Sequence, residues 1–105
     1  MRDYASDFPY LNDLVGGYFH QDWKSDGDTS DKVLAFYCRM ERPRVRSGAV
    51  ADIDRLLRVA ETEQHLICAL HQFGCALRVE SPRDWLVHIR QFVQSSLEKP
   101  SGRGQ

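Results

Sequence analysis

The spacing of apolar residues is the feature that most constrains the fold of this chain. Apolar side chains recur at intervals of three and four residues in nearly every segment, most regularly between Trp85 and Leu97. This interval matches the 3.6-residue turn of an α-helix. A half-buried strand would require four to eight residues of strict alternation between turn signals, and no segment has that pattern. We therefore predict an all-α fold, a compact single-domain bundle of about five helices.

Residues typical of helix ends divide the chain into these helices. Ser81-Pro82 places a capping residue before a proline at the first helical position. Thr29 or Ser30 and then Thr62 are predicted N-caps, and Gly74 suits the left-handed position that closes a helix. The predicted helices run from about Tyr10 to Phe19, from the Thr29-Ser30 cap to near Met40, along the apolar stripe from Val50 to Ala60, from Thr62 to Gly74, and from Pro82 to about Leu97.

Two segments interrupt this regular pattern. Gly16 and Gly17 lie inside the first predicted helix, where a glycine costs about 1 kcal/mol relative to alanine. We therefore expect another part of the backbone to approach closely at this pair. The segment Glu41–Arg46 is predicted to be a charged connection between helices, because Pro43 disfavours helix in the residue before it.

The length of 105 residues is that of one domain. We assign residues 1–98 to a single helical domain and residues 99–105 to a disordered tail with nothing to bury. No stretch approaches the roughly 20 apolar residues that span a bilayer, and the first residues lack the apolar part of a secretory signal. A cytoplasmic location without a membrane partner is expected. Cys38, Cys68 and Cys75 lie in apolar periodic segments and are predicted to be reduced thiols in the core.

Charge is unevenly distributed along the chain. The totals nearly cancel, with 14 Lys and Arg against 15 Asp and Glu, but residues 1–31 are acidic and contain only two cations, Arg2 and Lys24. The aspartates of this part are Asp3, Asp7, Asp13, Asp22, Asp26, Asp28 and Asp31. An acidic surface disfavours nucleic acid and favours a basic protein partner.

The same N-terminal part is rich in aromatic residues. They are Tyr4, Phe8, Tyr10, Tyr18, Phe19 and Trp23. Aromatic side chains next to charged ones are found at the centres of protein interfaces, but they also form ordinary cores. The sequence leaves both interpretations open.

Two groups of residues could in principle bind a metal, and both are incomplete. An EF-hand loop that began at Asp22 would have Lys24 at its third position and Val33 at its twelfth, where the bidentate glutamate belongs. His65, Cys68 and His71 recur every three residues, but no CxxC or HExxH motif completes a zinc site. We interpret them as two half-buried histidines beside a core cysteine, and we predict no metal and no cofactor.

Catalytic patterns are equally incomplete. Cys75 has no identifiable base or orienting group, and His20 with Asp22 lacks an oxyanion site or a second carboxylate. The arginines at positions 39, 42, 44 and 46 have no interleaved aromatic residues and are expected to be solvated or paired. We predict that the protein is not an enzyme, has no catalytic residues and does not bind nucleic acid.

Two segments carry a family resemblance. The first is Tyr10-Leu11-x-x-Leu14-x-Gly16-Gly17-Tyr18-Phe19-His20-Gln21-Asp22-Trp23, followed by Asp28-Thr29 and a helix that begins Asp31-Lys32-Val33. The second is Gly74-Cys75 followed by Ser81-Pro82-Arg83-Asp84-Trp85-Leu86, a cysteine-containing turn before a tryptophan-bearing last helix. Together they cover about half of the chain and resemble the immunity proteins of bacterial contact-dependent growth inhibition systems. The middle, residues 39–63, matches only as apolar helix, with arginines where such proteins typically have acidic residues.

The resemblance implies a small all-α cytoplasmic protein that binds the C-terminal toxin domain of a large effector. Such toxins are often nucleases, whose phosphate-binding site an acidic lobe would occlude. On this hypothesis the chain neutralises its cognate toxin by one-to-one binding, through His20, Gln21, Asp22, Trp23, Asp26, Asp28 and Asp31. The same His-Gln-Asp-Trp run is equally compatible with a structural signature of the family. The alternative is a helical adaptor or regulatory module that binds an endogenous bacterial protein.

Overall fold

The computed structural model describes residues 3–20, 29–75 and 79–98, and within these ranges the chain forms helices and no strand. The helices are α1 (Tyr4–Asp7), α2 (Pro9–Tyr18), α3 (Ser30–Met40), α4 (Pro43–Val59), α5 (Glu63–Gln72) and α6 (Pro82–Glu98). The all-α prediction is confirmed, and α1 is a single additional turn that the apolar spacing did not indicate. The predicted disordered tail, residues 99–105, lies outside the described residues.

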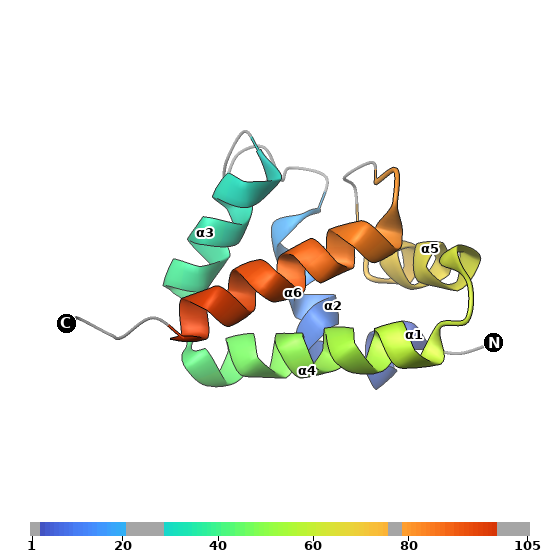
Figure 1. Ribbon diagram of the computed structural model, residues 1–105, viewed down its shortest axis with the longest axis horizontal. Helices are drawn as coiled ribbons and strands as arrows, with labels where there is room; N and C mark the ends of the chain where they lie inside the picture. The colour runs from blue at the N-terminus through green and yellow to red at the C-terminus, as the bar shows by residue number, and fades with distance from the viewer. Residues whose placement is uncertain (1–2, 21–28, 76–78, 99–105) are drawn as a thin grey trace.

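The two longest helices, α4 and α6, organise the fold. Each has 17 residues, and they pack against each other while running in opposite directions (Figure 1). Helix α6 also contacts α3 and α5, and α2 packs on α4. The short helix α1 connects the N-terminal end to α2 and α5. Every helix therefore contacts at least one of the other elements around a common core.

The core consists of the apolar stripes that the helical spacing predicts. A Val, Leu or Ile side chain contributes about 1.5–3 kcal/mol when it is fully buried, so these stripes provide most of the driving force for folding. All six helices contribute. The buried side chains on the five longer helices include Leu11, Leu14, Val15, Val33, Leu34, Ile53, Leu56, Leu66, Leu70, Leu86, Ile89 and Val93.

Most of the predicted helix ends are confirmed. The side chains of Thr29 and Thr62 accept hydrogen bonds from the backbone N–H groups of Lys32 and His65, as N-caps do. Gly74 has a φ of +82°, the left-handed conformation that closes a helix. Pro82 is the first residue of α6. These signals were readable because capping depends on residues close together in sequence.

The predicted connection Glu41–Arg46 is wrong for most of its length. Helix α4 begins at Pro43, so only Glu41 and Arg42 separate it from α3. The first turn of a helix needs no N–H donor at its first position, and the fixed φ of proline suits that position. Arg42 is extended, with φ −67° and ψ 156°, as the residue before a proline prefers. Pro43 therefore starts a helix here instead of interrupting one.

Gly16 is where another backbone segment approaches α2. A Cβ atom at this position would lie 2.5 Å from the carbonyl oxygen of Phe73, the residue that follows α5. At Gly17 nothing lies within 4 Å of such an atom. The expectation of close packing is confirmed for Gly16. Of the two glycines, only Gly16 lies where a Cβ atom would clash with another backbone segment.

Candidate functional site

The predicted contact residues lie between the end of α2 and the first turn of α3. The structure describes only two of them, His20 and Asp31. Gln21, Asp22, Trp23, Asp26 and Asp28 lie outside the described residues. His20 follows α2 and is half-buried, and Asp31 is exposed in the first turn of α3.

Helix α6 holds the residues on both sides of this segment. The ring of Phe19 meets the ring of Trp85 edge to face, with centroids 5.2 Å apart. The indole N–H of Trp85 donates to the hydroxyl of Ser30 at 3.3 Å. Because Phe19 follows α2 and Ser30 starts α3, one side chain of α6 contacts both ends.

A second side chain of α6 adds a hydrogen bond to this arrangement. Nε2 of His88 lies 2.7 Å from Oδ1 of Asp31, one turn along α6 from Trp85. The two side chains are 49% and 59% exposed, so solvent limits their contribution to less than about 1 kcal/mol. The fully buried Phe19 against Trp85 is the stronger anchor. The Asp31 carboxylate remains at the surface, in the first turn of α3, where the N-terminal end of the helix favours negative charge.

The N-terminal aromatic residues divide between core and surface. Tyr4, Phe8 and Phe19 are buried, which makes packing their main role. Tyr10 and Tyr18 are only half-buried. Trp23 lies outside the described residues. Packing is therefore confirmed for Tyr4, Phe8 and Phe19, and a role of Tyr10 and Tyr18 in binding stays a prediction.

Tyr10 and Tyr18 line a surface pocket formed by α2, α3 and the start of α4. Its volume is ≈ 390 Å³. The residues that line it, which we call the tyrosine pocket, are Tyr10, Asp13, Gly17, Tyr18, Tyr37, Glu41 and Val45. The hydroxyl of Tyr18 donates to Oε2 of Glu41 at 2.6 Å, which ties α2 to the residue after α3. The rings of Tyr18 and Tyr37 meet nearly perpendicular, at 88° and 5.1 Å between centroids.

Tyr37 is the unusual member of the tyrosine pocket. Its side chain is 1% exposed, and its hydroxyl has no hydrogen-bond partner among the described residues. Burial raises the pKa of Tyr37, because the phenolate would lose its hydration, and the negative charge of Glu41 acts in the same direction. The pocket wall therefore holds a neutral, buried hydroxyl. Sequence reasoning missed this group, since Tyr37 reads as one more apolar position of a helix.

A buried carboxylate supports the pocket from α4. Asp52 is 4% exposed, and its Oδ2 accepts hydrogen bonds from the backbone N–H groups of Tyr10 and Leu11 at 2.8 and 3.1 Å. These are unsatisfied donors of the first turn of α2, whose N-cap Phe8 has no capping side chain. Asp52 thereby caps α2 across the fold and holds Tyr10 in the pocket.

Arg55 completes the support around Asp52. Its Nη2 lies 2.9 Å from Oδ1 of Asp52 and donates to the carbonyl oxygen of Asp7 at 2.7 Å. The same guanidinium lies over the ring of Phe8, 4.7 Å from its centroid. Buried carboxylates need such partners. The apolar stripe of α4 gives no sign of this cluster in the sequence, because its members come from α4 and from residues more than 40 positions earlier.

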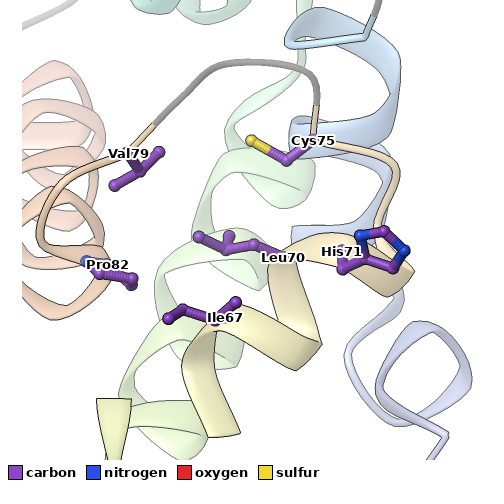
Figure 2. A pocket seen from close by; sticks show the side chains of 6 residues that line it. All are labelled: Ile67, Leu70, His71, Cys75, Val79 and Pro82. Atoms are coloured by element: carbon purple, nitrogen blue, oxygen red, sulfur yellow. The ribbon is translucent and has the colours of Figure 1, made fainter. Parts of the chain in front are cut away.

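Another pocket lies between α5 and the start of α6 (Figure 2), with a volume of ≈ 160 Å³. Ile67, Leu70, His71, Cys75, Val79 and Pro82 line it. Figure 2 shows that the His71 imidazole points away from the Cys75 sulfur, so the two are not arranged as a base and a nucleophile. The pocket is mainly apolar.

The expected half-buried histidines and core cysteine on α5 are wrong. His65, Cys68 and His71 are all exposed, because Leu66, Ala69 and Leu70 occupy the face of α5 that packs on the core. Cys38 and Cys75 are partly buried. In the described part of the chain, no group of three His, Cys, Asp or Glu side chains is placed to hold a metal ion.

No helix in the described ranges has the length and apolar character needed to cross a membrane.

Tyrosine is enriched at protein interfaces, and the tyrosine pocket places three tyrosines at one surface of a small all-α domain, which suits a protein-binding module. The model of the CdiI immunity protein family matches residues 7–93. A chain in the crystal structure of the CdiA-CT/CdiI complex from Y. kristensenii 33638 has the same fold, with a TM-score of 0.75 and 30% identity. The similarity covers 82% of this chain and 97% of that chain. No match was found among curated proteins.

The chain belongs to the CdiI immunity protein family. The family resemblance in the sequence is thereby confirmed, and the match extends through the middle of the chain, where the sequence alone indicated only apolar helix.

Proposed function

We propose that this protein neutralises a cognate toxin domain by binding it one-to-one, and that it is not an enzyme. One observation carries the proposal: the chain shares its fold, at 30% sequence identity over the matched part, with a chain from a complex of CdiI with CdiA-CT. An immunity protein inhibits its toxin by binding to it. Inhibition therefore depends on affinity and on complementary surfaces, and it needs no catalytic group. The place of action is the cytoplasm, where a delivered toxin would otherwise reach its target.

We propose that the toxin is a nuclease and that the acidic end of the chain meets its phosphate-binding surface. The support is electrostatic. Residues 1–31 combine seven aspartates with Arg2 and Lys24, and a nuclease site that binds phosphate is basic. Opposite potentials steer the two proteins together and speed their association. His20, Gln21, Asp22, Trp23, Asp26, Asp28 and Asp31 remain the proposed contacts of this end.

The proposal is tested by co-purification with the toxin domain encoded immediately upstream. Calorimetry should give a dissociation constant in about the nanomolar range, and toxin activity should vanish at an equal molar ratio. An absence of binding would contradict the proposal and point to an adaptor that binds an endogenous protein. Nuclease activity is assayed separately, with the toxin alone on RNA and on DNA.

The acidic end is tested with charge reversals at two aspartates between α2 and α3. Asp22→Lys with Asp26→Lys should slow association and make its rate less sensitive to salt. Glu61→Lys with Glu80→Lys is the matched control, because both glutamates are exposed and lie elsewhere in the chain. Equal association rates for both double variants would remove Asp22 and Asp26 from the interface.

A further inference from the structure

We propose that the tyrosine pocket receives a lysine or arginine side chain of the cognate toxin domain. The inference rests on the proposed function and adds the chemistry of one contact. It concerns residues other than the predicted acidic contacts: Tyr10, Asp13 and Tyr18 lie on α2, and Glu41 follows α3.

The charges of the tyrosine pocket select a cation. Asp13 and Glu41 line it, and none of its lining residues is basic. Within the described ranges, neither carboxylate forms an ion pair with a Lys, Arg or His side chain. Asp13 is exposed. The carboxylate of Glu41 accepts one hydrogen bond, from Tyr18, while the Arg46 guanidinium donates to the backbone carbonyl oxygen of Glu41 and not to its carboxylate. Two unneutralised carboxylates in one concave surface attract a positive side chain and disfavour an acidic one.

The rings of the pocket suit the same occupant. Tyr10, Tyr18 and Tyr37 come from two helices and line the pocket together with the two carboxylates. The face of an aromatic ring is negative, so an ammonium or guanidinium group is attracted to it, and the aliphatic stem of lysine or arginine packs on the ring carbons. Aromatic and acidic groups together therefore fit a long cationic side chain better than an apolar one.

The Tyr37 hydroxyl is an independent sign that something binds here. A buried hydroxyl without a hydrogen-bond partner is rare and destabilising, and its presence in a native protein calls for an explanation. Tyr37 has such a hydroxyl among the described residues, and Tyr37 is one of the residues that line the pocket. An N–H group of the incoming side chain would donate to this oxygen. The toxin would then satisfy a group that the free immunity protein leaves unsatisfied.

The pocket is also held in shape before any partner arrives. The hydrogen bond from Tyr18 to Glu41 fixes one wall, and the backbone N–H of Tyr10 is held by Asp52. A site that is already formed loses less conformational entropy on binding. We therefore expect the pocket to strengthen binding and to slow the dissociation of the complex.

The first test removes the two charges and keeps the shapes of the side chains. Asp13→Asn with Glu41→Gln should weaken binding of the toxin domain at least about tenfold, measured by calorimetry. The control is Glu61→Gln with Glu80→Gln, which changes the net charge equally and should stay within about twofold of the unmodified protein. Glu61 lies beyond the far end of α4, a helix about 25 Å long that starts next to Glu41.

The second test separates binding from folding. Tyr37→Phe removes a hydroxyl that has no partner within the described residues, so the melting temperature should not fall. Binding of the toxin domain should nevertheless weaken about threefold to tenfold. A variant that binds normally, together with an unaffected Asp13→Asn and Glu41→Gln protein, would overturn the inference while the proposed function stands. Failure of the unmodified protein to bind the toxin would instead overturn both.

Discussion

Oδ2 of Asp52 accepts a hydrogen bond of 2.8 Å from the backbone N–H of Tyr10, a residue 42 positions earlier in the chain. A helix normally receives its N-terminal cap from a residue next to it in sequence. Here the cap comes from the middle of α4, and it connects the packed pair α4 and α6 to α2, the helix that carries four of the residues lining the tyrosine pocket. Stability and the candidate site therefore depend on the same carboxylate.

Replacement of Asp52 by alanine should lower the free energy of unfolding by about 2–3 kcal/mol, because two backbone donors and Arg55 would lose their partner in a buried place. Urea denaturation measures this loss. Asp54→Ala is the control on the same helix. Asp54 pairs with Arg90 at 2.6 Å, but both side chains are about one-third exposed, and its removal should cost less than about 1 kcal/mol. Equal losses would show that Asp52 is not a special cap.

Substitution of the two adjacent glycines should have opposite effects. Gly16→Ala places a Cβ atom 2.5 Å from the Phe73 carbonyl oxygen and should destabilise the protein by about 1–3 kcal/mol, because α2 must move away. Gly17→Ala meets nothing within 4 Å and should stabilise it by up to about 1 kcal/mol, since alanine favours helix. Thermal melts of the two variants decide the matter, and a loss of stability in both would contradict the packing at Gly16.

Truncation of Trp85 should loosen both sides of the segment between α2 and α3. We expect Trp85→Ala to lower the free energy of unfolding by about 2 kcal/mol, less than for a fully buried tryptophan, and to weaken toxin binding as well. His88→Ala removes only the exposed pair with Asp31 and should cost less than about 1 kcal/mol. If the two variants were equally stable in urea, Trp85 would not be the main anchor.

Stability should fall with rising pH in the alkaline range because of Tyr37. The pKa of Tyr37 is raised in the folded protein, so the unfolded chain releases this proton first, near pH 10, while the folded protein retains it. The stabilisation is therefore present below that pH and is lost as pH rises above it, at a limiting slope of about 1.4 kcal/mol per pH unit. Melting temperatures between pH 9 and pH 11 test this, and Tyr37→Phe should show a shallower decline than the unmodified protein.

The helices and most of their ends were predictable from the sequence, because they depend on neighbours along the chain. The apolar stripe of α6 and the caps at Thr29 and Thr62 each involve residues within a few positions of one another. The wrong boundary at Pro43 has the same local origin: a proline either ends a helix or begins one, and the residues before it do not decide which. The helix α1 was missed because one turn is too short for a periodic signal.

The exposure of the α5 side chains shows where local reasoning ends. His65, Cys68 and His71 share one face of a helix, as their spacing requires, but the sequence does not say which face meets the core. In the structure the core lies against Leu66, Ala69 and Leu70, which leaves the other three exposed. Burial depends on which elements pack on a helix, and that is a property of the whole fold.

By itself, the sequence determined the helical class, most helix ends, the close approach at Gly16 and the family resemblance, since each follows from residues near one another in the chain. Only the tertiary structure brought Tyr10, Tyr37 and Glu41 into one pocket and placed Asp52 at the start of α2. These groups come from different helices, and their distances depend on how α2, α3 and α4 pack. Periodicity shows which residues share one face of a helix, but the packing of one helix on another decides which face is buried and which polar groups meet.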